Sequence, residues 1–450
     1  MKHHTTMIQK FTFLFVFLTI QLFAQNGLLQ SGPMVGYCEM KEAVIWLQST
    51  KVATARIEYF AIDEPKKVFV SENYTTSKDV AYTFHVILDQ LQEGKKYNYT
   101  VFLDNKKVNL PYETSFSSKK LWLWRGDAPD FSVALGSCNY INETIVDRPG
   151  KPYGSGYEIY TKIADKNPNI MIWGGDNIYL READWDSKTG IYHRYTHSRS
   201  TKEMQPLLAK TQNFAIWDDH DFGPNDADRG FYFKYQTQKA FKDFWGNKMY
   251  GIAPEQNEGT YSTFNWGDAQ FFLMDNRWNK SPNDRKTSER ILLGKEQLDW
   301  LIDNLVTSNA PFKIIVIGGQ TLNTAEVFEN YSTYKAEKEL LLSEIKANKI
   351  KGIMFISGDR HFSELSMQNR DNAYPLYDWT VSPLTSGVVS ADKTEKEPNT
   401  NRVAGSMFNE HNFGMIYFSG SKADRQMKLV LNNREGKEIW SKIILKKDLE

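Results

Sequence analysis

Six short, largely apolar runs mark the chain from residue 130 onward. Such runs, without strict alternation, are typical of strands that are buried on both faces of a sheet. Segments with helical spacing lie between them, at residues 294–307, 334–348 and, more weakly, 156–165. Strands that alternate with helices predict an α/β domain with a core of buried strands. The six runs cover residues 131–135, 170–173, 214–217, 269–274, 312–317 and 353–356.

Residues 25–118 show a different pattern, in which β-rich stretches are separated by turns. The stretches 43–48, 55–60 and 82–88 are rich in β-branched and aromatic residues. Residues 91–101 resemble the L-x-P-G-x-x-Y-x-Y corner of fibronectin-III-like domains, with Glu93 in place of the proline. Short strands at this spacing predict a small all-β, fibronectin-III/Ig-like sandwich. We expect it to be an accessory domain, joined by a polar linker to a catalytic domain at residues 130–450.

The first 24 residues have the layout of a secretory signal. Lys2 and Lys10 flank a short polar start, residues 11–23 are almost entirely apolar, and Ala24 supplies a small residue before Gln25. Such a stretch is too short for a stable membrane anchor. We therefore expect a signal peptide, no membrane span in the mature chain, and a periplasmic or extracellular location.

Composition and charge narrow the range of partners. The 450 residues carry 55 acidic and 55 basic side chains, so the formal net charge is zero and no nucleic-acid-binding footprint is present. The length is sufficient for two domains and a large core. The two cysteines, Cys38 and Cys138, could form one disulfide in an oxidising compartment. The position of Cys138 directly after an apolar run favours a ligand role instead.

Polar residues follow four of the six runs, at the strand ends where α/β sheets place their chemistry. The third run leads into Trp-Asp-Asp-His-Asp, whose adjacent carboxylates repel one another and are costly to desolvate. A bound cation removes that cost, so this string predicts a metal site. Glycine precedes the polar group in three of the four strings, which lets the backbone pass close to a ligand. The strings are Gly-Ser-Cys-Asn at 136–139, Gly-Gly-Asp-Asn-Ile-Tyr at 174–179, Asp-Asp-His-Asp at 218–221 and Ser-Gly-Asp-Arg-His at 357–361.

The residue types in these strings form a mixed hard and soft ligand set. A thiolate together with a phenolate favours a trivalent ion such as Fe³⁺, and the oxygen-rich remainder would accept a second, divalent ion. Two neighbouring cations suit phosphoryl chemistry, because they hold phosphate oxygens and lower the pKa of a bridging water. His220 is the candidate general acid near the leaving oxygen.

The four strings, in this order, resemble PhoD-type alkaline phosphatases and phosphodiesterases, which belong to the calcineurin-like metallophosphoesterases. They read G-S-C, G-D-x-x-Y, W-D-D-H-D with a following Asn, and G-D-x-H. Lesser matches are D-N-R at 275–277, L-G-K-E-Q at 293–297 and N-F-G at 412–414. The resemblance implies a four-layered α/β/β/α metallophosphoesterase sandwich after the β-sandwich. It also implies an exported phosphoric ester hydrolase that depends on metal ions.

The resemblance further implies a role for each site residue. The iron site takes a thiolate, a carboxylate and a phenolate, and this carboxylate bridges to a second ion, which is Ca²⁺ in such enzymes or another divalent ion. His220 and Asp221 are the implied catalytic residues, and Asn225 would bind a metal or hold phosphate. The implied metal ligands are Cys138, Asp176 and Tyr179 for Fe³⁺, followed by Asp218, Asp219, Asp359 and His361.

Two arginines next to the ligand strings, Arg181 and Arg360, are predicted to bind substrate. A guanidinium group neutralises phosphate through two parallel hydrogen bonds, although each arginine could equally form a supporting ion pair. His193 and His197 lie four residues apart on one helical face, and we favour a surface or substrate-side helix there over a metal site.

Three alternatives to this function can be compared with the sequence. A phosphodiesterase acting on nucleotides, phospholipid head groups or teichoic-acid-like polymers is the main one among enzymes. Purple acid phosphatases also combine a β-sandwich with G-D-x-x-Y, but they require G-N-H-E and G-H-x-H, and neither string occurs here. An inactive secreted binding protein would show degenerated ligand positions, which we do not find. We expect a monomer that acts on a small-molecule or polymer phosphate ester.

Overall fold

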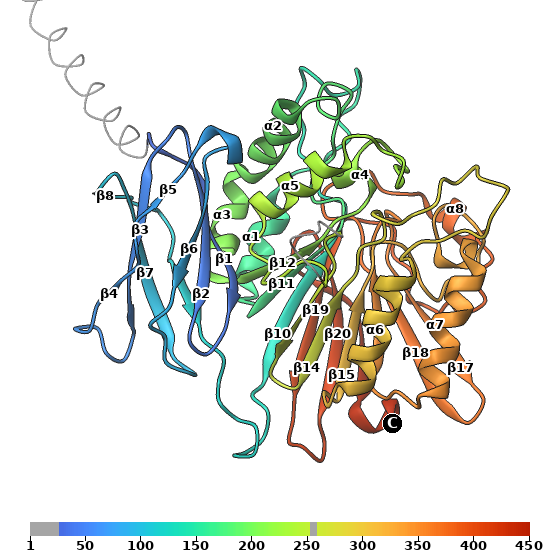
Figure 1. The fold of residues 1–450 in the computed structure, drawn as a ribbon. Coiled ribbons are helices and arrows are strands. Elements are labelled where there is room, and N and C mark those ends of the chain that lie inside the picture. The colour runs from blue at the N-terminus through green and yellow to red at the C-terminus, as the bar shows by residue number, and fades with distance from the viewer. Residues whose placement is uncertain (1–26, 253–258) are drawn as a thin grey trace, which may run out of the picture.

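The computed structural model describes residues 27–252 and 259–450. An all-β region, β1–β9, precedes a larger α/β region, as Figure 1 shows. The predicted signal peptide at residues 1–24 lies outside the described residues. Among the residues that are described, no helix combines the length and the apolar character needed to cross a bilayer.

The all-β region is a sandwich of two sheets, as the sequence predicted. Strand β3 alternates between buried and partly exposed positions, because one of its faces packs on the other sheet. Ile57 and Tyr59 of β3 share this core with Ile45 and Leu47 of the facing sheet. The strands are β1 (Leu29–Cys38), β2 (Ala43–Ser49) and β6 (Thr83–Leu88) in one sheet, and β3 (Thr54–Ala61), β4 (Phe69–Val70), β5 (Tyr74–Thr75), β7 (Lys96–Leu103), β8 (Lys106–Lys107) and β9 (Ser115–Ser117) in the other.

Two six-stranded sheets form the centre of the α/β region. Strands β10, β11 and β12 are parallel in the first sheet, and β14, β15, β16 and β18 are parallel in the second. The first sheet has the order β12 (Gln212–Ile216), β11 (Ile170–Gly174), β10 (Phe131–Gly136), β19 (Asn412–Ser419), β20 (Gln426–Asn433), β21 (Glu438–Leu445), and the second has β13 (Ser262–Trp266), β14 (Ala269–Leu273), β15 (Phe312–Val316), β16 (Ile353–Ser357), β18 (Ala373–Thr380), β17 (Glu364–Arg370).

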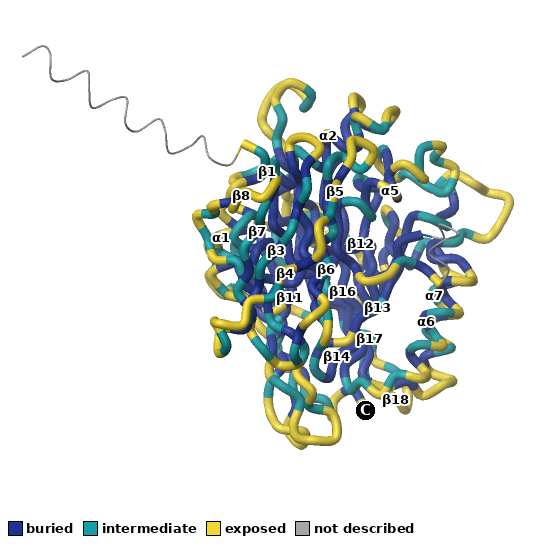
Figure 2. The backbone as a smooth tube through the Cα atoms, turned by 60° about the vertical axis from the view of Figure 1, so that its left-hand side comes forward, coloured by how far each residue is buried: buried dark blue, intermediate teal, exposed yellow. Residues whose placement is uncertain are grey.

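The two sheets pack face to face, and helices cover both outer faces. Phe214 and Ile216 of β12 point into the core between the sheets, whereas Ala215 and Trp217 point into the helical layer. Both faces of such a strand are buried (Figure 2), which is why its sequence is continuously apolar. The predicted α/β/β/α sandwich is therefore confirmed. The covering helices are α1 (Glu158–Asp165), α2 (Lys188–Arg199), α3 (Gln205–Lys210) and α5 (Lys234–Phe244) on one side, and α6 (Lys295–Thr307) and α7 (Lys335–Ala347) on the other.

The predicted elements agree with the structure to within about two residues at most ends. All six apolar runs are strands, and the three predicted helices are α1, α6 and α7. The connection between β18 and β19 contains the short helix α8 (Ala391–Glu395). His193 and His197 lie on α2, and His193 Nε2 is 2.9 Å from a carboxylate oxygen of Glu143.

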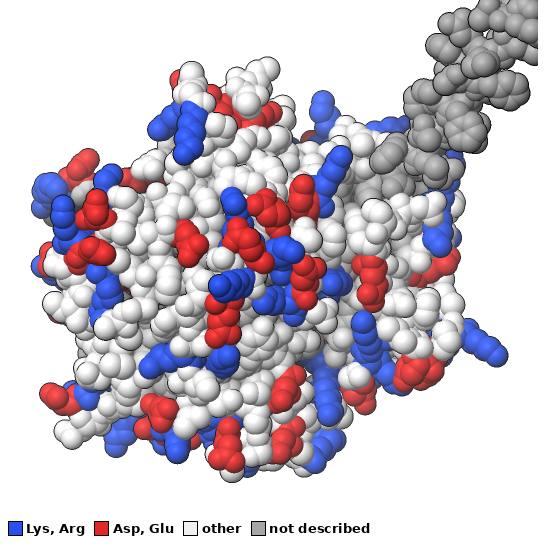
Figure 3. All heavy atoms as spheres, turned by 180° about the vertical axis from the view of Figure 1, so that it is seen from behind, with Lys and Arg blue, Asp and Glu red and all other residues white. Residues whose placement is uncertain are grey.

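The β-sandwich is packed onto the helical layer of the catalytic region. The Trp46 indole stacks near Phe244 of α5, with ring centroids 5.5 Å apart, and its Nε1 donates to the Asp243 carbonyl at 2.8 Å. Both cysteines are buried and free, so the disulfide is not formed. On the face shown in Figure 3, acidic and basic side chains are interspersed, in agreement with the zero net charge.

Candidate metal centre

The predicted ligands meet where the parallel strands of both sheets end. Cys138 follows β10, Asp176 follows β11, Asp218 follows β12, and Asp359 follows β16. Because parallel strands of one sheet end at the same edge, residues far apart in sequence come together there. Two sheets contribute to this site, and the cluster lies at the junction of their ends.

Four of these residues have a left-handed backbone conformation. The φ angles of Cys138, Asp176, Asp359 and His361 are 60°, 52°, 64° and 57°. Residues other than glycine rarely adopt this backbone conformation, and a strained residue of this kind costs about 1–3 kcal/mol. Such residues concentrate at functional sites, because the surrounding structure holds them in place to aim a side chain. The loops after β10, β11 and β16 share this geometry, whereas Asp218 after β12 has extended backbone.

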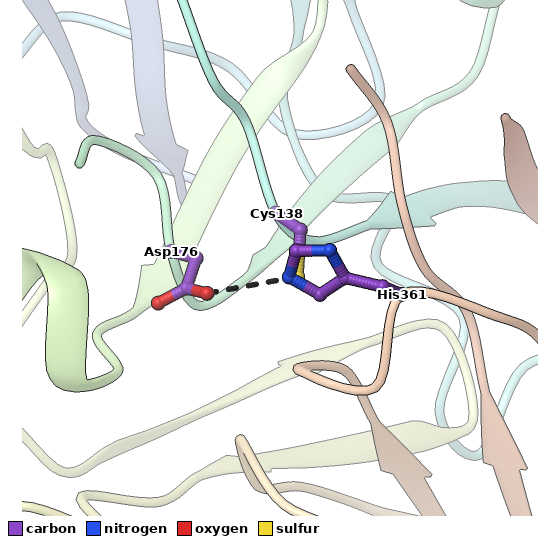
Figure 4. A group of neighbouring side chains, drawn as sticks. All are labelled: Cys138, Asp176 and His361. Atoms are coloured by element: carbon purple, nitrogen blue, oxygen red, sulfur yellow. Dashed lines mark hydrogen bonds between the residues drawn. The ribbon is translucent and has the colours of Figure 1, made fainter. Parts of the chain in front are cut away.

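The first ligand group contains the thiol, a carboxyl group and an imidazole. Ligand atoms of Cys138, Asp176 and His361 all lie within 4.8 Å of one another, and Figure 4 shows the side chains converging. Tyr179 joins them, since its hydroxyl is 3.1 Å from Asp176 Oδ2 and 3.3 Å from His361 Nε2. His361 Nδ1 lies 2.6 Å from the Gly387 carbonyl. A protonated Nδ1 would donate a hydrogen bond to that carbonyl and leave Nε2 free to bind a metal.

Two further groups extend the site toward the second sheet. One contains Asp176, Asp219 and His220, and the other contains Asp218, Asp219 and Asp359; each meets the same 4.8 Å limit. Asp176 and Asp219 are therefore each shared by two groups. Asp218 Oδ2 and Asp219 Oδ1 are buried and have no hydrogen-bond partner among the described residues. Buried carboxylate oxygens without a partner are costly, and a cation would satisfy them.

The carboxyl groups of the cluster outnumber the positive charges next to them, and the pKa values of three of these groups are raised. Burial raises the pKa of Asp218 and of Asp359 to about 7. The pKa of Asp176 is well above its usual range, because of burial and then because of the Asp219 carboxylate. Burial also acts to raise the pKa of Asp219, but His220 favours its charged form and the net shift is downward. Metal ions fit this set, because they would supply the missing charge to oxygen, sulfur and imidazole donors.

A buried charge network supports Asp218 from the second sheet. The Arg277 guanidinium forms ion pairs with both Asp218 and Glu329. Lys280 Nζ lies 2.6 Å from the other Glu329 oxygen, and Asn276 Nδ2 donates to Asp218 Oδ1 at 2.9 Å. The only sequence signal for this network is the string D-N-R after an apolar run. No local pattern marks Glu329 or Lys280.

Asp221 and Asn225 lie in different surroundings from the ligand groups. The Asp221 carboxylate accepts hydrogen bonds from the backbone N–H groups of Asn177, at 3.1 Å, and Asp218, at 3.0 Å. It thereby ties the two ligand loops together. Asn225 is exposed in the turn after α4 (Asp219–Phe222), and the next residue, Asp226, donates its N–H to Asp219 Oδ2 at 2.7 Å.

The two candidate substrate-binding arginines both form ion pairs. A supporting ion pair was the alternative to substrate binding for each of them. Arg181 Nη2 lies 2.9 Å from Asp147 Oδ1, and its guanidinium stacks over the Tyr140 ring at 4.0 Å. Arg360 Nη2 lies 2.6 Å from Glu397 Oε2. Both guanidinium groups are buried, so either would have to break an ion pair to reach phosphate.

Gly318 brings a fifth strand end against the cluster. A Cβ atom at this position would overlap Asp218 Oδ2 and Asn276 Nδ2. We expect Gly318→Ala to lower the free energy of unfolding by about 1–3 kcal/mol, as overpacking does, and to reduce activity by displacing Asp218. Chemical denaturation and an ester hydrolysis assay measure both effects. Gly126→Ala is the matched control, because a Cβ there has no neighbour within 4 Å; equal behaviour of the two variants would contradict the expectation.

Solved structures share this architecture. The structure of PhoD superposes with a TM-score of 0.75 at 17 % identity, over 94 % of this chain and 90 % of that chain. A purple acid phosphatase from yellow lupin (Lupinus luteus) seeds gives 0.62 at 12 % identity, over 92 % and 74 % of the two chains. At these identities the likeness establishes the fold. The fold and its ligand cluster together define an α/β/β/α protein with a candidate metal centre at its strand ends.

Family comparison gives the narrower assignment. Residues 134–429, more than half of the chain, match the family model described as PhoD-like phosphatase. The chain therefore belongs to the PhoD-like phosphatase family and is a phosphoric ester hydrolase. Alkaline phosphatase D of Bacillus subtilis (strain 168) is 23 % identical over 417 residues, which cover 81 % of this chain and 67 % of that protein. Residues 26–121 match a model described as a domain of unknown function, DUF7800.

Proposed function

We propose that the protein hydrolyses phosphate mono- and diesters at a dinuclear metal centre. The observation that supports a dinuclear site best is the sharing of Asp176 and Asp219, each by two ligand groups. When bound, two metal ions at this position would hold phosphate oxygens and activate the attacking water. The adjoining groups overlap through shared carboxylates, so the donors are arranged for neighbouring ions rather than for one isolated ion.

We propose Fe³⁺ at the group that contains Cys138 and Tyr179, and Ca²⁺ or another divalent ion at the oxygen-rich group. The thiol and the phenol both lie within 3.6 Å of Asp176 Oδ2, and this donor set suits a trivalent ion. Asp218, Asp219 and Asp359 offer only carboxylate oxygens, which hard divalent cations prefer. Asp176 belongs to the first group and to the group of Asp219, which supports a bridging role.

Other residues of the chain would orient the substrate and the leaving group. His220 stacks on Tyr179, with ring centroids 4.2 Å apart, and follows Asp219 directly in the chain. We propose that it protonates or orients the leaving oxygen. We propose that exposed Asn225 binds a metal or holds phosphate, because the next residue, Asp226, is hydrogen-bonded to Asp219. We assign Asp221, Arg181 and Arg360 positioning roles, because their contacts hold the ligand loops.

We further propose that the chain is exported. The supporting observation is the signal-like layout of residues 1–24, and the mass of the mature protein tests it. Within the mature chain, we propose domain boundaries at 25–118 and 130–450, separated by the irregular segment after β9.

Metal content and hydrolysis test the proposal together. We expect the purified protein to contain iron and calcium, to hydrolyse p-nitrophenyl phosphate or its bis-ester, and to lose activity on chelation. Asp359→Ala should lower kcat/KM by at least about 10- to 100-fold, the range seen when support for a metal ligand is removed. Elemental analysis and steady-state kinetics give the readouts, with Asp371→Ala in an exposed turn as the control. Full activity and metal content in Asp359→Ala would contradict the assignment. The ratio of the two esters decides between monoester and diester preference.

A further inference from the structure

An exposed tyrosine stands beside the metal centre. Tyr153 is 48 % exposed, and its hydroxyl lies 3.2 Å from His361 Nδ1. Its ring packs edge-on against Tyr140, with centroids 4.9 Å apart. Tyr140 and Tyr179 are buried, so Tyr153 is the ring of this aromatic group that faces solvent.

The backbone beneath Tyr153 fixes the position of its ring. A Cβ atom on Gly387 would lie 2.7 Å from the Tyr153 ring, so the ring rests directly on this glycine. The Gly387 carbonyl also contacts His361 Nδ1 at 2.6 Å. One short segment therefore contacts both the predicted metal ligand and the exposed ring.

Two more exposed apolar side chains lie next to residues that contact or adjoin His361. Val388 follows Gly387 and is exposed, and the Phe328 ring, 74 % exposed, lies 4.8 Å from the Arg360 guanidinium. Exposed apolar groups next to a polar centre are typical of a surface that receives the apolar part of a ligand.

We propose that Tyr153 determines leaving-group specificity by stacking against phosphate esters whose leaving group carries an aromatic ring. The inference rests on the proposed hydrolysis and adds the substrate class. While the phosphate is held at the ligand cluster, an aromatic leaving group stacks on the exposed Tyr153 face. Such stacking is worth about three- to tenfold in kcat/KM. The hydroxyl of Tyr153 has a separate role, which is to hold the His361 ring.

Three variants separate the ring from the hydroxyl. Tyr153→Ala should lower kcat/KM for p-nitrophenyl phosphate about three- to tenfold more than for glycerol 2-phosphate, which has no ring. Tyr153→Phe keeps the ring and should keep the wild-type ratio of the two esters. Tyr153→Leu keeps apolar surface without an aromatic face and should lose most of the preference. Trp124→Ala, which removes an exposed ring in the linker, is the control and should leave the ratio unchanged.

Binding of phosphonates, which are not hydrolysed, distinguishes this inference from the proposed function. Calorimetry should show tighter binding of phenylphosphonate than of methylphosphonate, and Tyr153→Ala should remove the difference. Preserved binding preference without turnover of any ester would support the inference and overturn the proposed hydrolysis. If Tyr153→Ala lowers kcat/KM equally for both esters, so that their ratio is unchanged, the inference is overturned and the proposed hydrolysis stands.

Discussion

Asp176→Asn should lower kcat/KM by about 10³-fold. The carboxylate belongs to two ligand groups, with Oδ2 3.1 Å from the Tyr179 hydroxyl and 3.6 Å from Cys138 Sγ. An amide of the same size keeps the packing, but its neutral oxygen is a weaker metal ligand than a charged carboxylate. Metal ions supply several kcal/mol of charge stabilisation in the transition state, and about 4 kcal/mol corresponds to three powers of ten in rate. Steady-state kinetics and elemental analysis measure the two losses.

The same substitution should leave the metal-free protein at least as stable as the wild type. Burial is the main reason why the pKa of Asp176 is raised, and the neighbouring acidic groups raise it further. An ionised Asp176 therefore opposes folding when no cation is present. Removing that charge relieves repulsion. Urea denaturation in the presence of a chelator measures the free energy of unfolding.

Asp268→Asn is the matched control for this prediction. Asp268 is another buried carboxylate, but it pairs with Arg425, with two contacts of 2.9 Å, in the turn between β13 and β14. Its replacement should lower stability by about 1–3 kcal/mol, because the buried Arg425 guanidinium loses one of its two carboxylate partners, and should leave kcat/KM unchanged. A large loss of stability in metal-free Asp176→Asn, with activity retained, would show that Asp176 is structural.

The parallel strands were predictable because both of their faces are buried. Residues 214–217 are continuously apolar for that reason, and the run leads directly into the ligand string. Helix α5 (Lys234–Phe244) was missed, since its sequence is largely polar and its helical structure depends on packing Phe241 and Phe244 against the sheet. Strand β20 was not identified either; it alternates as an antiparallel strand near the edge of the sheet, where the apolar signal is weaker.

The ligand cluster was predictable to the extent that each ligand lies within a few residues of a buried strand. Asp176 and Asp359 are of this kind. Tyr153 and Glu329 lie in long connections, and their position next to the cluster depends on how those connections fold back over the strand ends. No local pattern carries that information. The ion pairs of Arg181 and Arg360 likewise depend on partners 34 and 37 residues away, which sequence spacing alone cannot identify.

Arg277→Met should destabilise the protein by about 3–5 kcal/mol, the cost of breaking a buried ion pair by removing one partner. Arg277 is 1 % exposed and pairs with both Asp218 and Glu329. Lys280 stays next to Glu329, at 2.6 Å, so the larger uncompensated charge is that of Asp218. Arg277→Lys keeps the charge but lacks the planar guanidinium group that reaches two carboxylates. It should therefore lose less stability than Arg277→Met. Chemical denaturation in a chelating buffer measures each difference.

A double-mutant cycle locates the origin of that loss. If most of it comes from the unpaired Asp218 carboxylate, then Arg277→Met combined with Asp218→Asn should be more stable than the sum of the single changes predicts. Additive losses, or a loss below about 1 kcal/mol for Arg277→Met, would contradict the account. Arg277 neutralises only part of the charge of the carboxylates around it, so the remaining charge is left for bound cations to neutralise. Adding metal ions should therefore restore stability to Arg277→Met more than to the wild type, provided that the ligand geometry survives the substitution.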